Sequence, residues 1–168
     1  MRHRLERRLN SYWKLEAGNV VLVPAFTGWA VLQLGGAITS PLVLAMAAVS
    51  ALLVVGAAAW RMELAGLRGE RGFAPALLPW LSLAQGPTLL LSIASVGGAG
   101  FEVWRGGWSV TAVATCILAL LAMLEYINYY VVQLQHFDHP ADFKRLMSGR
   151  GFREAHLAKA LRAHRKRG

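Results

Sequence analysis

The sequence predicts an all-α integral membrane protein: a bundle of four transmembrane helices, with an amphipathic segment before it and a basic helical tail after it. Hydrophobic residues make up 55% of the chain and charged residues only 16%, whereas about a quarter of a typical soluble domain is charged. The apolar residues gather in four blocks, and each block reaches the roughly 20 residues that cross the hydrocarbon layer. The expected helices span about 18–37, 41–60, 76–96 and 108–137.

The positions of the basic residues predict the orientation of this bundle. All but one of the 18 Lys and Arg residues lie before the first block, between the second and third blocks, or after the fourth. The exception is Arg105. Because short loops that carry Lys and Arg stay in the cytoplasm, we expect both ends of the chain to be cytoplasmic, in a bacterial inner membrane.

The chain divides into three segments around these helices. Residues 1–17 place Leu5, Leu9 and Trp13 near helical spacing with arginines between them, which is typical of a helix that lies on the cytoplasmic leaflet. Residues 18–137 form the transmembrane domain, and residues 138–168 form the basic cytoplasmic tail. The net charge of +9 is accounted for by the positive-inside rule, which disfavours nucleic acid as a partner.

The expected partners are therefore anionic lipid headgroups, which attract basic residues beside a membrane. The second block is rich in small residues, among them Ala47, Ala51 and Gly56. Small residues let helix backbones approach closely in lipid. We expect this helix to be central in the bundle, and a homo-oligomer or a larger membrane complex to be possible through it.

A helix-breaking run interrupts the third block at Gln85, Gly86 and Pro87. One interpretation is a tolerated kink, whose freed backbone groups find partners inside the protein. The alternative is a discontinuous helix of the kind that builds binding sites in transporters. In that case Gln85 is a candidate substrate-binding residue.

The cytoplasmic end of the fourth block carries most of the chemically capable side chains. Glu125, Asn128, Tyr129, His136 and His139 recur at spacings of three and four, so a continuous helix would place them on one face. Glu125 lies about 26 Å along the helix from Trp108, just inside the cytoplasmic boundary. An ionisable residue at that depth is a functional candidate, or it pairs with a basic residue such as Arg61, Lys14 or Arg8.

Two sites follow from these residues. Glu125, His136, Asp138 and His139 are candidate catalytic residues, with a histidine acting as general base beside a carboxylate, and Asn128 and Tyr129 are candidate substrate-binding residues. His136 and His139 are also candidate ligands of a divalent metal. The competing interpretation is a helix start at residues 138–142, where Asp138 or His139 caps and Pro140 takes the first helical position.

The sequence thus favours a small polytopic membrane protein that acts as a subunit, scaffold or regulator through its basic cytoplasmic surface. One alternative is a membrane-embedded enzyme that acts on a lipid or other amphipathic substrate through Glu125, His136, Asp138 and His139. Another is a small transporter formed by oligomerisation. The single cysteine, Cys116, lies in an apolar block and indicates packing rather than thiol chemistry.

Overall fold

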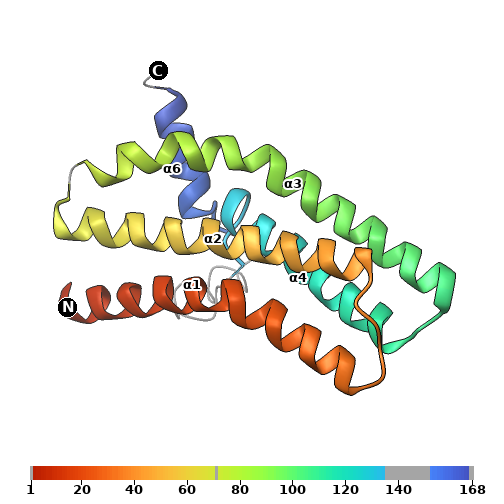
Figure 1. Cartoon of the computed structure of the whole chain (residues 1–168). Helices are drawn as coiled ribbons and strands as arrows, with labels where there is room; N and C mark the ends of the chain where they lie inside the picture. Colours follow the sequence, from red (N-terminus) through yellow and green to blue (C-terminus); the bar gives the residue numbers. More distant parts are fainter. Residues whose placement is uncertain (1, 71, 135–151, 167–168) are drawn as a thin grey trace.

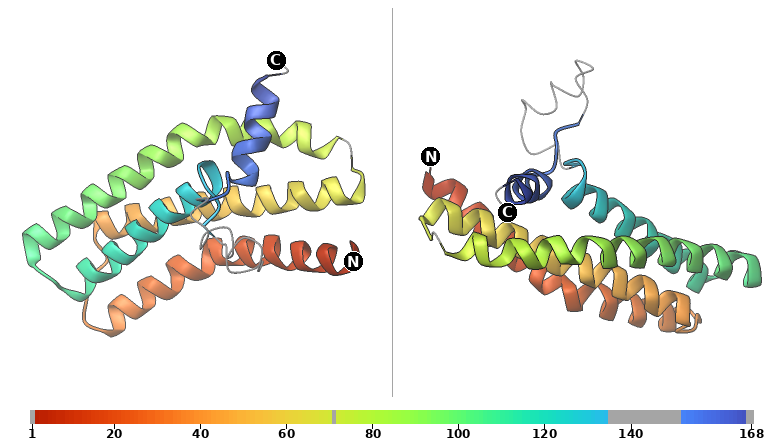
Figure 2. Two further views of the ribbon diagram at one scale, coloured as in Figure 1. Left: turned by 180° about the vertical axis from the view of Figure 1, so that it is seen from behind. Right: turned by 90° about the horizontal axis from the view of Figure 1, so that it is seen from above.

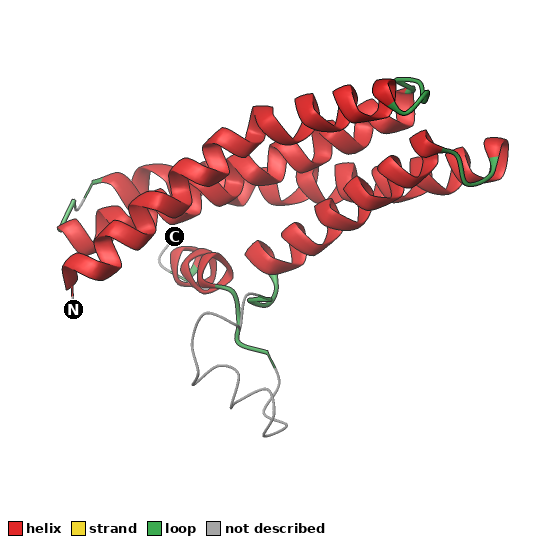
Figure 3. Ribbon diagram, turned by 90° about the horizontal axis from the view of Figure 1, so that it is seen from below, coloured by secondary structure: helices red, strands yellow, loops and turns green. Residues whose placement is uncertain are grey.

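The computed structural model describes residues 2–70, 72–134 and 152–166. Five helices form in these residues: α1 (Arg2–Gln33), α2 (Ser40–Arg68), α3 (Phe73–Gly106), α4 (Val110–Tyr130) and α6 (His156–Arg165) (Figure 1). Four of them, α1 to α4, are long and apolar enough to cross a membrane. The predictions of an all-helical fold and of four helices long and apolar enough to cross a membrane are therefore confirmed for the described residues (Figure 3).

The four long helices run alternately up and down, and α2 lies at the centre of the arrangement (Figures 1 and 2). It packs along α1, α3 and α4, whereas α1 packs along α2 and meets α4 at only a few points. The start of α1, the connection between α2 and α3, and α6 lie toward the same end of the bundle. The α1–α2 and α3–α4 connections lie at the opposite end.

Three of the long helices exceed the thickness of a bilayer. At 1.5 Å per residue, α1, α2 and α3 measure about 48, 44 and 51 Å, against about 30 Å of hydrocarbon. Helix α1 is continuous from Arg2, so the boundary expected between residues 17 and 18 falls inside it. The N-terminal segment is thus the first half of the first long helix, rather than a separate surface helix.

Helix α4 ends at Tyr130, seven residues before the end that the sequence predicted. The backbone amides of Val131 and Val132 both donate to the carbonyl of Ile127, which closes the last turn. The side chain of Asn128 then accepts a hydrogen bond from the amide of Leu134, at 2.9 Å. This local capping turns the chain toward the segment before α6, where Val132 and Glu154 form an antiparallel bridge.

Helix α3 continues through both of its prolines, Pro79 and Pro87. The hydroxyl of Thr88 donates to the carbonyls of Ala84 (2.7 Å) and Gln85 (3.2 Å) beside the second proline. Figure 1 shows a bend in this helix but no interruption. The interpretation as a tolerated kink is correct, and the discontinuous helix is not.

The connections between the long helices are short and close on glycines in the left-handed region: Gly35 (φ +76°), Gly69 (φ +79°) and Gly107 (φ +66°). Glycine is favoured there because it has no Cβ to clash with the backbone. At the opposite end from α6, the hydroxyl of Thr111 accepts from the amide of Ala37 (3.0 Å) and donates to its carbonyl (3.1 Å). These two bonds fix the α1–α2 connection to the start of α4.

The core runs along α2 and ends beneath α6. Leu42, Val49 and Leu52 of α2 are completely buried. Toward the other end, the buried rings of α4 and the buried leucines Leu157 and Leu161 of α6 belong to the same cluster. Helix α6 is therefore docked on the bundle through an apolar face, and its basic residues remain outside.

Candidate functional site

Two carboxylates meet where α1, α2 and α4 converge. Glu16 comes from α1 and Glu125 from α4, and Tyr129 lies between them. The hydroxyl of Tyr129 donates to Glu16 Oε1 at 2.6 Å. Gly56 of α2 makes room for this ring, because a Cβ at that position would lie 2.3 Å from the Tyr129 hydroxyl. Trp60 lies beside Glu16, and Asn128 lies beside Glu125.

Neither carboxylate has a basic partner among the described residues. Arg61, expected as a partner of Glu125, pairs with Glu70 at 3.0 Å and lies over the ring of Phe73. One oxygen of Glu16 and one of Glu125 are buried and accept no hydrogen bond in the described chain. The structure therefore brings two carboxyl groups together where a salt bridge was expected, and the predicted pairing of Arg61 with Glu125 is wrong.

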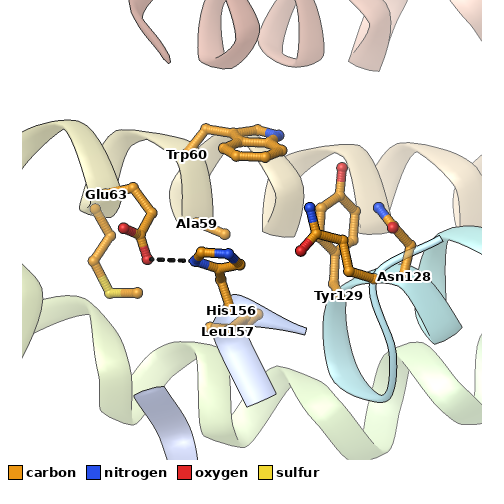
Figure 4. Close-up of a pocket in the computed structure, with 9 residues that line it drawn as sticks. Ala59, Trp60, Glu63, Asn128, Tyr129, His156 and Leu157 are labelled. Carbon is orange, nitrogen blue, oxygen red and sulfur yellow. Dashed lines mark ion pairs between the residues drawn. The ribbon is translucent and has the colours of Figure 1, made fainter. Parts of the chain in front are cut away.

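A partly open cavity of about 30 Å³ borders this carboxylate pair, between α2, α4 and α6 (Figure 4). Such a volume holds one or two water molecules. Its polar lining residues are Glu63, Asn128, Tyr129, Gln133 and His156. The side-chain oxygen of Gln133 is buried and has no hydrogen-bond donor in the described chain, so it needs a water molecule or a ligand group there.

His156 of α6 and Glu63 of α2 form an ion pair at the edge of the cavity. Nδ1 of His156 lies 3.8 Å from Glu63 Oε1 (Figure 4). The neighbouring carboxylate raises the pKa of His156, while its partial burial and the charges of Arg153 and Lys159 act in the opposite direction. The pair thus links the docking of α6 to the protonation of one histidine.

A second, apolar groove of about 430 Å³ lies between α1 and α4, toward the opposite end of the bundle. Phe26, Thr27 and Ala30 line it from α1, and Val113 and Ala114 line it from α4. Trp108, which is 74% exposed, lies at its end. The groove exists because α1 and α4 are in direct contact at only a few points.

Of the predicted site residues, Glu125, Asn128 and Tyr129 are brought together at the cavity and the carboxylate pair. Gln85 lies elsewhere, where its side chain accepts a hydrogen bond from Arg165 at 2.7 Å. The predicted residues His136, Asp138 and His139 lie outside the described residues. The part of the chain that is described contains no group of three metal-capable side chains, so the metal site stays a prediction.

Several residues of this region were missed by sequence reasoning, namely Glu16, Trp60, Glu63, Gln133 and His156. All of them except Gln133, which follows Tyr129 by four positions, are distant in sequence from the Glu125 face, and their association depends on helix packing. One signal was present for Glu16. It sits at the junction of the basic segment and the first apolar block, at the level where Glu125 was expected on the fourth helix.

Comparison with known proteins gives no relative for this chain. No protein-family model, no curated protein and no solved structure matches it.

Proposed function

We propose that the chain is a membrane-embedded scaffold or regulatory subunit, which holds a basic surface at the cytoplasmic leaflet of a bacterial inner membrane. The charge asymmetry of the bundle supports this proposal. Among the described residues, every Lys and Arg except Arg105 belongs to the first half of α1, the last eight residues of α2, or residues 152–166. These segments lie toward one end of the bundle (Figure 2).

The positive-inside rule assigns that end to the cytoplasm. An anionic leaflet attracts each basic residue near its surface by about 1 kcal/mol. Because α6 is docked through Leu157 and Leu161, Lys159 and its basic neighbours are held beside the bundle. In a tail that did not pack on the bundle, the same charges would have no fixed position. The docking of α6 therefore favours binding to a leaflet, or to a partner surface of defined shape.

The orientation is tested by labelling single cysteines with a membrane-impermeant reagent in a Cys116→Ser background. We expect Trp108→Cys to react on intact spheroplasts, and Lys166→Cys to react only after permeabilisation. Both positions are exposed. Labelling of both from the same side would refute the four-crossing topology.

Lipid engagement is tested in nanodiscs that contain either phosphatidylglycerol or phosphatidylcholine. We expect the anionic lipid to raise the unfolding temperature, and we expect the Arg7→Gln/Lys159→Gln variant to lose much of that increase. Arg105→Gln is the control, because it removes a positive charge at the opposite end of the bundle. No dependence on anionic lipid, or an equal loss in Arg105→Gln, would count against the proposal.

The enzymatic alternative depends on His136, Asp138 and His139 together with Glu125. It is tested by metal analysis of the purified protein and of its His136→Ala and His139→Ala variants. A stoichiometric metal that both substitutions remove would favour the enzyme over the scaffold. The transporter alternative has lost its main support, because α3 is continuous through Gln85 and Pro87.

A further inference from the structure

Helices α1 and α4 leave an incompletely filled interface, which we call the α1–α4 seam. It comprises the facing sides of these helices, from Glu16 and Glu125 at one end to the apolar groove at Thr27 and Ala114 at the other. Every other pair of neighbouring long helices packs extensively, whereas α1 relies on α2 alone. The seam is thus a place in the described bundle where another helix can gain contacts with two helices at once.

The carboxylates and the groove belong to the same faces of the two helices. Glu16 and Thr27 are separated by three helical turns on α1, and Ala114 and Glu125 are separated by three turns on α4. The axial distance between the acidic end and the groove is therefore the same on both helices, about 16 Å. A single straight helix that lies in the seam would reach both features.

The two ends of the seam demand different chemistry from an occupant. The groove is lined by apolar side chains, with Thr27 as the main polar residue, and it fits apolar side chains. At the other end, Glu16 and Glu125 each keep a buried oxygen without a donor, and no basic residue of the described chain pairs with them. Buried charges in membranes are normally paired, so a cation with hydrogen-bond donors would complement this end.

We propose that the α1–α4 seam docks a transmembrane helix of a partner protein that carries a Lys or Arg near its cytoplasmic end. The apolar face of that helix fills the groove, and its basic side chain, three turns away, donates to the buried second oxygens of Glu16 and Glu125 after these two side chains rotate toward the seam. This inference deepens the proposed scaffold function, since it names the chemistry of the partner. A lipid chain would fill the groove but would bring no donor to the carboxylates.

The proposal is tested with a synthetic Leu–Ala transmembrane peptide that carries one Lys near its cytoplasmic end and an acceptor dye. The matched probe has Gln in place of that Lys. The protein carries a donor dye at Lys166→Cys in the Cys116→Ser background, and binding is measured by energy transfer in phosphatidylcholine vesicles. Polar contacts between helices in membranes contribute about 0.6–2 kcal/mol, so the Lys peptide should bind roughly three- to thirtyfold tighter than the Gln peptide.

Two variants separate the two features of the seam. Glu16→Gln/Glu125→Gln should abolish the preference for the Lys peptide, while Glu102→Gln, which removes a carboxylate at the other end of the bundle, should keep it. Ala114→Phe fills the groove and should weaken the binding of both peptides. The vesicles are zwitterionic, so the result does not depend on binding to anionic lipid. The scaffold proposal and the docking proposal can therefore fail independently.

Three results would overturn the inference. The Lys and Gln peptides could bind equally well, or the preference could persist in Glu16→Gln/Glu125→Gln. Neither peptide could bind at all, which would leave lipid as the occupant of the seam. Finally, unlabelled protein could displace the Lys peptide as effectively as unlabelled Lys peptide does, which would identify a second copy of this chain as the occupant.

Discussion

Replacing Gly56 by Ala is the sharpest test of the packing around the carboxylate pair. The added Cβ would lie 2.3 Å from the hydroxyl oxygen of Tyr129 and 2.5 Å from its Cζ. Since non-bonded atoms pack at about 3.5–4.0 Å, the ring must retreat by about 1 Å. That movement also breaks the 2.6 Å hydrogen bond from Tyr129 to Glu16.

The expected cost follows from these two effects. Overpacking a filled site costs about 1–3 kcal/mol, and a hydrogen bond to a charged group contributes about 1.5–3 kcal/mol. The higher helix propensity of Ala offsets up to about 1 kcal/mol of this cost. We therefore expect Gly56→Ala to lower the free energy of unfolding by about 2–4 kcal/mol. The assay is reversible unfolding in mixed micelles, followed by circular dichroism.

Gly66→Ala is the matched control in the same helix. No atom lies within 4 Å of a Cβ at Gly66, so this change should stabilise by about 0.5–1 kcal/mol through helix propensity. The double variant Gly56→Ala/Tyr129→Leu should be less destabilised than the sum of its single variants, because the smaller side chain removes the clash. Equal stability of Gly56→Ala and Gly66→Ala would refute the close approach of Tyr129 to α2.

Three further predictions concern other contacts. Glu63 raises the pKa of His156. The ion pair therefore stabilises the docking of α6 fully at pH values below the ordinary histidine pKa of about 6.5. This stabilisation is lost as the pH rises through the raised pKa of His156. Hydrogen exchange of α6 should therefore become faster at high pH in the wild type, with a weaker pH dependence in His156→Gln but not in His164→Gln. Leu161→Ala truncates a side chain that is 3% exposed and should cost about 2–5 kcal/mol of α6 docking, measured by limited proteolysis, with exposed Lys159→Ala as the control. Thr111→Val leaves the Ala37 amide without its 3.0 Å acceptor and should cost about 1–3 kcal/mol. In the same unfolding assay Thr115→Val should cost less, since Thr115 bonds only a carbonyl of its own helix.

The number and approximate positions of the long helices were predictable from sequence, because each depends on an apolar run of sufficient length. The residues at which these helices end were less predictable. The apolar pattern stops near Trp60, yet α2 continues to Arg68, because helix-favouring residues, among them the buried Met62, Leu64 and Ala65, extend it beyond the apolar block. The end of α4 at Tyr130 was missed because it depends on the Asn128 side chain and on pairing with residues after 152.

The candidate site was predictable only in part. Glu125, Asn128 and Tyr129 share a helix face, so periodicity was enough to group them. The approach of Glu16 to Tyr129 joins residues 113 positions apart, and it depends on how α1 packs on α2. Arg61 was expected to pair with Glu125 because their charges are opposite. It pairs instead with Glu70, which lies only nine positions along the chain.

The reliance of α1 on a single neighbour has a consequence for how the protein is assembled in the cell. Helix α1 precedes α2, its only extensive packing partner among the described helices. While the ribosome is still making α2, α1 has only lipid around it, and its candidate spanning window is less hydrophobic than that of α2, with a mean hydropathy of 1.4 against 2.5. Its retention in the bilayer should therefore depend on the timely arrival of α2, and substitutions that delay insertion of α2 should expose α1 to quality-control proteolysis before the native fold exists.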